Sequence, residues 1–393
     1  MKLFGKDFQK DKGETLMLYA VLSQSLWGLV QTVLVDVFNY SEEAGSKIRV
    51  LLVVATMIYA IVYGFIKKPS QFFITYACAV IVLLFTLMIF PQNQPYIESE
   101  AYKLTLPVVL PSFLCLTCVK DFDMIERVFY KIAWLSFGVA FIYAFLIFTG
   151  GYIFSQYSMS LSFALLLPTL ILYNHKNILS LIAALFLFVL IVFLGSRSAA
   201  VVIVIYIFVD TLLYNRKYIL PVSVFAVIGF VYINFFTGLF GSFGIESRTL
   251  AIMMSDDGLL GHMSHRDEIY DVCISTIQEY PILGIGLYGD RLLFHGSTSH
   301  NVVLEILLNF GVFIGGGIII ALLVYFFKTF ISASRDRRVY FMRYFCAVII
   351  PLMVSGSYLK DYNLGLFLGI CYLINKERVN KFSSLKNKSH IHG

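Results

Sequence analysis

The fold follows from residues 48–90, which read IRVLLVVATMIYAIVYGFIKKPSQFFITYACAVIVLLFTLMIF. Two apolar runs, 48–66 and 71–90, are separated here by Lys67 and Lys68. Each run has the length of about 20 residues that an α-helix needs to cross a bilayer. Residues 48–90 therefore predict two transmembrane helices joined by a short basic turn.

Runs of this kind recur along the chain, from Leu16 almost to Asn375. Of the 393 residues, 59% are hydrophobic and 14% are charged, whereas soluble domains are about 45–50% apolar and about 25% charged. Soluble and disordered proteins are thereby excluded. We expect one all-α integral membrane domain over residues 1–393, a bundle of about 12 spans. The predicted spans are 16–38, 48–66, 71–90, 104–119, 131–148, 157–173, 178–194, 198–214, 218–236, 300–327, 339–354 and 362–375.

The basic residues orient these spans, because Lys and Arg gather in cytoplasmic loops. They occupy every second connection, as at Lys67–Lys68, Arg216–Lys217 and Arg335–Arg338, and the tail from Lys376. Both termini are therefore expected in the cytoplasm, with SEEAGS and PQNQPYIESE on the outer face. The formal charge of +6 then reflects topology and does not indicate nucleic-acid binding. No cleavage site precedes the first span, so we expect no removable signal peptide.

One outer connection, residues 237–299, is far longer than the others and is expected to be folded. Ser264 to Asp267 match a capping box that opens a helix, and Pro281 is expected to end that helix. The segment PILGIGLYGD then predicts a tight turn. The apolar positions of the expected helix are Ile269, Cys273, Thr276, Ile277 and Tyr280, and the turn glycines are Gly284, Gly286 and Gly289.

The long loop contains Arg248, Arg266 and Arg291 but no lysine, and Arg197 lies in GSRSA between two predicted spans. Arginine binds phosphate through two parallel hydrogen bonds, so these residues are candidate ligands of a phosphate group. Two plainer interpretations stay open. Arg197 could extend to the membrane interface, and Arg266 could form a weak surface ion pair with its acidic neighbours.

The tenth predicted span opens with STSHNVVLEILLNFG, residues 297–311. We expect Ser299 or Thr298 as its N-cap, which places His300 and Asn301 in the first turn, where anions are favoured. Glu305 lies four residues after Asn301 and shares its face of the helix. His300 is a candidate general base or hydrogen-bond donor, although an ordinary interfacial histidine would fit the same pattern.

No metal, cofactor or disulfide framework is expected. His262, His265 and His295 do not complete a tetrahedral ligand set, and no Walker A, Rossmann or nucleophile-elbow motif occurs. Of the six cysteines, only Cys273 lies in the long loop, where it has no partner.

Taken in order, these motifs resemble the signature region of the O-antigen ligase and O-antigen polymerase superfamily. The resemblance rests on an arginine that opens a loop helix (Arg266), on PILGIGLYG and on HNVVLEILLNFGVFIGGG, which ends at Gly317. GSRSA at 195–199 is similar to the Ser-Arg motif of the family. The number of spans and the long outer loop agree with this family as well.

The resemblance implies a GT-C-like membrane glycosyltransferase that uses no metal and takes a glycan from undecaprenyl pyrophosphate. It implies that Arg197 and Arg266 hold the pyrophosphate and that His300 assists the acceptor hydroxyl, with Glu305 as an alternative base. Arg248, Arg291, Asn301 and His295 are further candidate substrate-binding residues. The implied location is the bacterial cytoplasmic membrane, with the active loop outside, and the implied products are capsule, exopolysaccharide or O-antigen. Candidate partners are membrane lipid and the flippase and chain-length regulator of the same pathway.

Three functions fit these expectations. The first is a repeat-unit polymerase, which moves the chain onto the terminal sugar of another lipid-linked repeat. The second is a ligase with a lipid-core or protein acceptor. The third is a transporter or flippase of the same lipid-linked sugars. Transporters place ionisable residues in mid-membrane. Here the predicted spans are nearly free of charge at mid-depth, and the charged candidate residues cluster at the outer face, so an enzyme is favoured.

Overall fold

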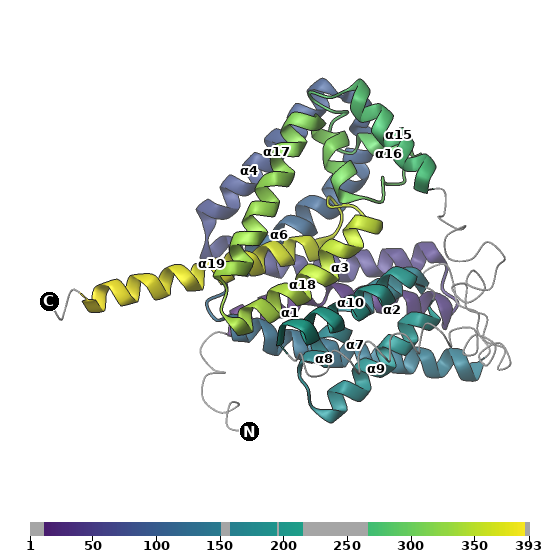
Figure 1. Ribbon diagram of the computed structural model, residues 1–393. Coiled ribbons are helices and arrows are strands. Elements are labelled where there is room, and N and C mark those ends of the chain that lie inside the picture. Colours follow the sequence, from purple (N-terminus) through teal and green to yellow (C-terminus); the bar gives the residue numbers. More distant parts are fainter. Residues whose placement is uncertain (1–11, 151–157, 195, 215–265, 390–393) are drawn as a thin grey trace.

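The structure is a computed structural model that describes residues 12–150, 158–194, 196–214 and 266–389 (Figure 1). All regular structure in these residues is helical and none of them forms a strand, which confirms the all-α prediction. The helices are α1 (Lys12–Leu22), α2 (Gln24–Asp36), α3 (Glu42–Lys67), α4 (Pro69–Ile89), η1 (Pro91–Asn93), α5 (Gln94–Tyr96), η2 (Ile97–Val109), α6 (Leu110–Thr117), α7 (Phe122–Gly150), α8 (Ser158–Asn174), α9 (Ile178–Phe193), α10 (Arg197–Tyr214), α15 (Arg266–Glu279), α16 (Gly289–Leu293), α17 (Val302–Ser332), α18 (Arg335–Val354) and α19 (Tyr362–Ser389).

Several helices are long and apolar enough to cross a membrane, so the chain is a multi-pass membrane protein. Five such segments occur among the described residues, and the bent pair α1–α2 makes a sixth if it is one span. The five are Glu42–Lys67, Pro69–Ile89, Pro91–Cys118, Phe122–Leu146 and Val302–Ser332. The helices α8, α9 and α10 are apolar but shorter. The predicted span 218–236 lies outside the described residues, so the count of about 12 remains a prediction.

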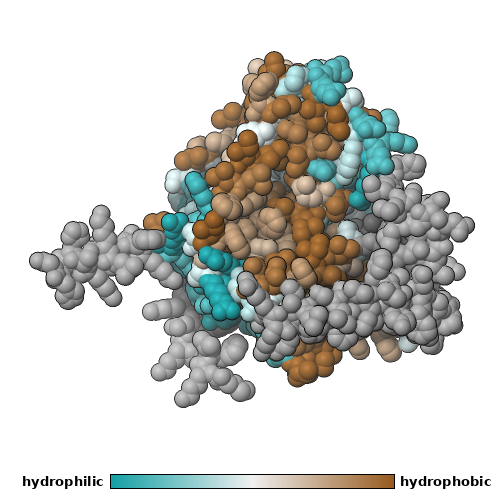
Figure 2. All heavy atoms as spheres, viewed as in Figure 1, coloured by the Kyte–Doolittle hydropathy of each residue, from teal (hydrophilic) through white to brown (hydrophobic). Residues whose placement is uncertain are grey.

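The surface of these helices agrees with lipid contact. Figure 2 shows apolar side chains spread over the face that contains α4 and α17, with hydrophilic residues gathered toward α15. On α4, Phe73 is 67% exposed and Met88 is 83% exposed. Large apolar side chains exposed over a continuous face mark contact with lipid or a partner, and on a helix of this hydropathy lipid is the fitting surrounding.

The first predicted span, 16–38, is bent by 47° between α1 and α2. At the break, Ser23 Oγ and Gln24 Nε2 both donate to the carbonyl of Ala20, at 3.2 and 2.8 Å. Side chains that bond to the helix backbone compete with its regular hydrogen bonds and bend the axis. The polar pair Ser23–Gln24 therefore accounts for the bend.

Two segments that we expected outside helices are helical. PQNQPYIESE was expected as an outer loop, but residues 91–118 form one helical segment made of η1, α5, η2 and α6. Its Asn93 is fully buried and bonded to a distant part of the chain, so this segment belongs to the packed structure. The last span was expected to end near residue 375, but α19 continues to Ser389 and extends away from the bundle (Figure 1). Its added residues contain no glycine or proline, the two residues that disfavour helix most.

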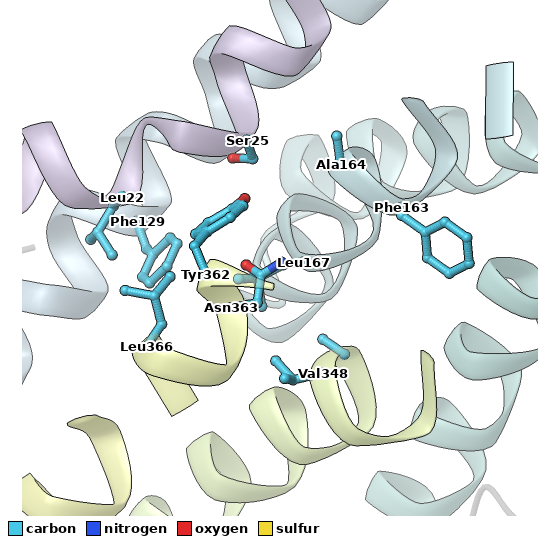
Figure 3. A pocket seen from close by; sticks show the side chains of 11 residues that line it. Leu22, Ser25, Phe129, Phe163, Ala164, Leu167, Val348, Tyr362, Asn363 and Leu366 are labelled. Carbon is cyan, nitrogen blue, oxygen red and sulfur yellow. The ribbon is translucent and has the colours of Figure 1, made fainter. Parts of the chain in front are cut away.

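A large buried apolar core joins α1, α7, α8, α9, α18 and α19. A small pocket opens inside it near the α1–α2 break, where the ring of Tyr362 points toward Ser25 (Figure 3). Except for Ser25, Tyr362 and Asn363, its lining side chains are apolar. Two smaller apolar clusters lie elsewhere, under the segment 281–301, and include Leu287 and Tyr288 in one and Cys273 and Leu308 in the other. The segment 281–301 thus has apolar support of its own.

Helix α17 is broken at Gly311, whose φ of 73° and ψ of 175° are not helical. In a regular helix the amide of Val312 would donate to the carbonyl of Leu308. Here Val312 N donates to Pro281 O, and Leu308 O accepts from Ile285 N, both at 2.7 Å. The donor and the acceptor of one helical hydrogen bond are therefore both bonded to the segment 281–285 instead of to each other.

Gly284 permits this close approach. Its φ is +66°, and an added Cβ would collide with the carbonyl of Leu308 and the amide of Gly311. Glycine is the residue that adopts such a backbone without steric cost. The segment 281–285 and the break in α17 therefore require each other.

Replacing this glycine should destabilise the protein. We expect Gly284→Ala to lower the free energy of unfolding by more than about 1 kcal/mol, because alanine is strained at positive φ and meets backbone atoms that cannot move aside. The measurement is the thermal unfolding midpoint in detergent. Gly316→Ala is the matched control, since that helical glycine has open space around it and alanine favours helix. Equal midpoints for the two variants would contradict the proposed role of the close approach.

Candidate active site

Helix α15 places Arg266 at its first position and packs against α17. The helix ends at Glu279, two residues before Pro281, as predicted. Cys273, Thr276 and Ile277 are buried, which confirms the helical spacing expected for them, whereas Tyr280 is 46% exposed. Ser264 and His265 of the expected capping box lie outside the described residues. Burial, and after it the charge of Asp290, raises the pKa of the Cys273 thiol to about 12, so this cysteine is a packing residue.

The glycine-rich segment turns tightly, as predicted, and is held by a residue from far upstream. Gly284 and Gly286 have positive φ, whereas Gly289 does not and begins α16. The side-chain Nδ2 of Asn93 donates to the backbone carbonyls of Ile285 and Leu287, at 2.9 and 3.0 Å. The turn is thereby attached to the start of the 91–118 helical segment.

Arg291 on α16 is the centre of a buried ionic network, although we expected it to contact substrate. Its side chain has no exposed surface. Nη1 donates to both oxygens of Asp290, at 2.5 and 2.7 Å, and to Oε1 of Glu305, at 2.7 Å. Burial by itself would lower the pKa of Arg291, but the Asp290 and Glu305 carboxylates outweigh burial and raise the pKa above its ordinary value.

Two further segments complete this network. From η2, Oε2 of Glu100 lies 3.3 Å from Nε of Arg291. From the connection between α18 and α19, Ser357 Oγ accepts from Nη2 of Arg291 at 2.7 Å and donates to Glu305 Oε1 at 2.5 Å. Lys360 pairs with the other oxygen of Glu100 at 2.6 Å. Asp290, Arg291, Glu305, Glu100 and Ser357, called the arginine network below, therefore join four separate parts of the chain.

His300 lies directly before α17 and not inside it. Asn301 is the N-cap, since its Oδ1 accepts from the amides of Val303 and Leu304 at 2.9 and 3.2 Å. Our expectation that Ser299 or Thr298 caps the helix is therefore wrong. An asparagine side chain is among the strongest N-caps, and capping by Asn301 leaves His300 one residue outside the helix. The backbone of His300 has a φ of 55°, a region that costs a residue with a side chain about 1–2 kcal/mol.

The imidazole of His300 is half-buried, and its two nitrogens differ. Nε2 lies 3.4 Å from the hydroxyl of Ser297. Nδ1 is buried and finds no hydrogen-bond partner among the described residues. Burial, and after it the positive charge of Arg266, lowers the pKa of His300, while Asp290 opposes this shift. The charge of Arg266, at the start of α15, is therefore one of the two charges that shift the pKa of His300.

The other predicted residues are placed less fully. Arg248, His262 and His265 lie outside the described residues, and so does the side chain of Arg197, although that residue begins α10. His295 is exposed, in the turn after α16. Glu305 is wholly buried in the arginine network. Over the described parts of the chain, no group of three His, Cys, Asp or Glu side chains could hold a metal ion.

Sequence reasoning missed the residues that support the site from a distance. Asn93 and Glu100 were assigned to an exposed loop, and Ser357 and Lys360 drew no attention. The one available signal was the pair of acidic residues in YIESE, close to a segment without lysine. Asp290 was also overlooked, although it directly precedes Arg291.

The class of protein is now defined: in its described residues it is an all-helical, multi-pass membrane chain, with an arginine that opens α15, a histidine that precedes α17 and a buried ionic network between α16 and α17. Residues 181–319 match the family model described as O-antigen ligase. This match confirms the resemblance to the O-antigen polymerase and ligase superfamily, and it supports a membrane glycosyltransferase-like enzyme. No curated protein matches the chain. The matched residues run from α9 into α17 and include Arg197, Arg266, His300 and Glu305, but neither Glu100 nor Ser357.

The arginine network should matter strongly for stability. We expect Arg291→Ala to lower the free energy of unfolding by about 3–5 kcal/mol, because it leaves buried carboxylates without a counter-charge. The measurement is the unfolding midpoint in detergent. The control is Arg127→Ala, which breaks a pair with Asp121 whose side chains are 38% and 49% exposed and which should cost less than about 1 kcal/mol. A small effect of both substitutions would show that the network carries little of the stability.

Proposed function

We propose that this chain is a polysaccharide repeat-unit polymerase. It transfers a glycan from undecaprenyl pyrophosphate to a sugar hydroxyl of another lipid-linked repeat, on the outer face of the bacterial cytoplasmic membrane. The family match supports a ligase- or polymerase-like activity, and the donor, acceptor and orientation are our proposal. The observation that carries it is a half-buried His300 whose Nδ1 has no hydrogen-bond partner among the described residues, and whose pKa the charge of Arg266 lowers.

Arg266 suits the pyrophosphate leaving group, and His300 suits the acceptor hydroxyl. Pyrophosphate is already a good leaving group and needs its negative charge stabilised more than it needs a proton. Arg266 offers a guanidinium for that charge, and we propose that Arg197 and Arg248 assist it. In the same step, the acceptor oxygen bonds to the anomeric carbon, the bond from this carbon to the pyrophosphate oxygen breaks, and the hydroxyl proton passes to His300.

We revise two of the roles that we expected from the sequence, because the burial of the two side chains supports other assignments. Glu305 has no exposed surface and is bonded to Arg291 and Ser357, so we assign the base to His300 alone. Arg291 has no exposed surface either, so we assign it to the support of the site and not to substrate binding. Asn301 caps α17 through its side-chain oxygen, which fixes where the helix begins after His300.

A ligase is the second candidate, because the description of the matching family is O-antigen ligase. It would use the same donor and the same arginine and histidine, with a lipid-core or protein acceptor. A transporter of lipid-linked sugars would need neither a base nor a released pyrophosphate. The three functions therefore differ in what becomes of the glycan.

Reconstitution distinguishes these functions. With lipid-linked repeats as the only substrate in nanodiscs, we expect a ladder of lengthening glycans on a gel. We expect His300→Ala to slow extension by about 10²–10⁴-fold, as for loss of a general base, and Arg266→Ala by about 10²–10³-fold, as for loss of one charge-stabilising donor. Arg127→Ala, remote in the chain and exposed, should extend normally.

Other products would replace this proposal. Transfer only when a lipid-core or protein acceptor is added would identify a ligase. Movement of the lipid-linked sugar across a vesicle bilayer, with no transfer to any acceptor, would identify a transporter.

The rate should depend on pH through His300. A base must be neutral to act, and the pKa of His300 is lowered from its ordinary value of about 6.5. We therefore expect extension to be at its plateau at pH 7 and to fall only below about pH 6.5. In Arg266→Gln the lowering charge is absent, so the acid limb of kcat/KM should move to higher pH. An acid limb of wild type that lies above pH 7 would contradict His300 as the base.

A further inference from the structure

The environment of His300 contains a buried carboxylate that the proposed mechanism does not use. Asp290 has no exposed surface, and its Oδ2 accepts from the backbone amide of Ser299, next to His300, at 3.4 Å. The same carboxylate receives both short bonds from Arg291. Asp290 thus links the other members of the arginine network to Ser299, the residue that precedes the histidine.

The backbone at this point needs such support. His300 has a φ of 55°, as noted above, and a strained backbone persists only where its surroundings hold it on several sides. On one side Asn301 caps α17. On the other side Thr298 Oγ1 donates to Gly356 O at 3.4 Å, and Ser299 N donates to Asp290. Strain of this kind gathers at functional sites, where it fixes the direction of a side chain.

Resting on the proposed function, we infer that Asp290 is a positioning residue for His300, and that Arg291, Glu305 and Ser357 hold Asp290 in place. Asp290 and Arg291 lie on α16, Glu305 lies on α17, and Ser357 lies on the connection between α18 and α19. Asp290 is wholly buried, so we assign it no contact with substrate. Asp290 affects His300 in two ways, through its hydrogen bond to the backbone amide of Ser299 and through its charge.

The charge of Asp290 provides a readout that a purely structural role would not change. Two charges act on His300, namely Arg266 from α15, which lowers its pKa, and Asp290 from α16, which raises it. The nearby charges of Glu305 and Lys360 are already paired, with Arg291 and Glu100. Removal of the Asp290 charge should therefore lower the pKa of His300 further, whereas removal of the Arg266 charge should raise it.

The first measurement needs no substrate. Diethyl pyrocarbonate modifies neutral imidazole, so the rate of His300 modification against pH, followed by peptide mass spectrometry, reports its titration midpoint. We expect Asp290→Asn to move the midpoint to lower pH and Arg266→Gln to move it to higher pH. Asp271→Asn, which removes an exposed carboxylate from α15, should leave it unchanged. An unchanged or raised midpoint in Asp290→Asn would overturn the inference.

The second measurement uses glycan extension. We expect Asp290→Asn to lower kcat by on the order of 10²-fold with little change in KM, because a displaced base slows the chemical step. Asp290→Glu keeps the charge but not the length, so it should keep the wild-type midpoint and still lose kcat. A loss that appears only in KM would assign Asp290 to substrate binding and would overturn the inference.

Ser357→Ala covers the case in which the Asp290 variants do not fold. It leaves every charge in place, so we expect the modification midpoint to stay as in wild type while kcat falls. An unchanged kcat would show that the arginine network does not position the histidine. If wild type extends no glycan with any acceptor, the proposed function fails, while the modification midpoints still test the inference by themselves.

Discussion

A guanidinium with no contact to water must be surrounded by groups that balance its charge and accept hydrogen bonds from its five N–H donors. The side chain of Arg291 is such a buried guanidinium. Its partners come from η2, α16, α17 and the connection before α19, so these elements can meet in only a few ways. Burying these ions costs several kcal/mol of desolvation free energy for each ion. The ion pairs and hydrogen bonds of the network offset this cost only if all of them form. The network therefore favours one arrangement of four distant segments over near alternatives.

The break in α17 is the second constraint, and it works through the backbone. The segment 281–285 enters the helix because one helical hydrogen bond is given up on both sides and is replaced by bonds to the loop. The amide of Val312 and the carbonyl of Leu308 both keep a hydrogen-bond partner in the exchange, which matters most where water is scarce. The loop that leads to His300 is thus attached to α17 at two positions along the helix. Backbone hydrogen bonds attach it near Gly311, and side chains attach it near Glu305.

Much of this architecture is visible in the sequence, because the apolar runs, the proline after α15 and the left-handed glycines act locally. His300 and Arg266 could be proposed from the sequence because each stands at a predicted helix boundary. The supporting residues were not found, since Glu100 and Ser357 lie 191 and 66 residues from Arg291 and no local pattern links them. Arg291 shows the same limit: an arginine in a polar loop suggests phosphate, and only the fold reveals that carboxylates enclose it. The count of spans could not be settled by length alone, because helices such as α8 and α9 are apolar but short.

The stretch that matches the family ends at residue 319 and begins at residue 181, yet the arginine network extends beyond it on both sides. A chimera that inherits only this stretch from a relative would receive the histidine and the arginine without the carboxylate from η2 or the serine before α19. Residues 181–319 therefore cannot be exchanged between relatives without residues outside this stretch. During divergence, changes on the two sides of its borders would have to occur together, and grafting experiments would have to carry η2 and the α18–α19 connection along with it.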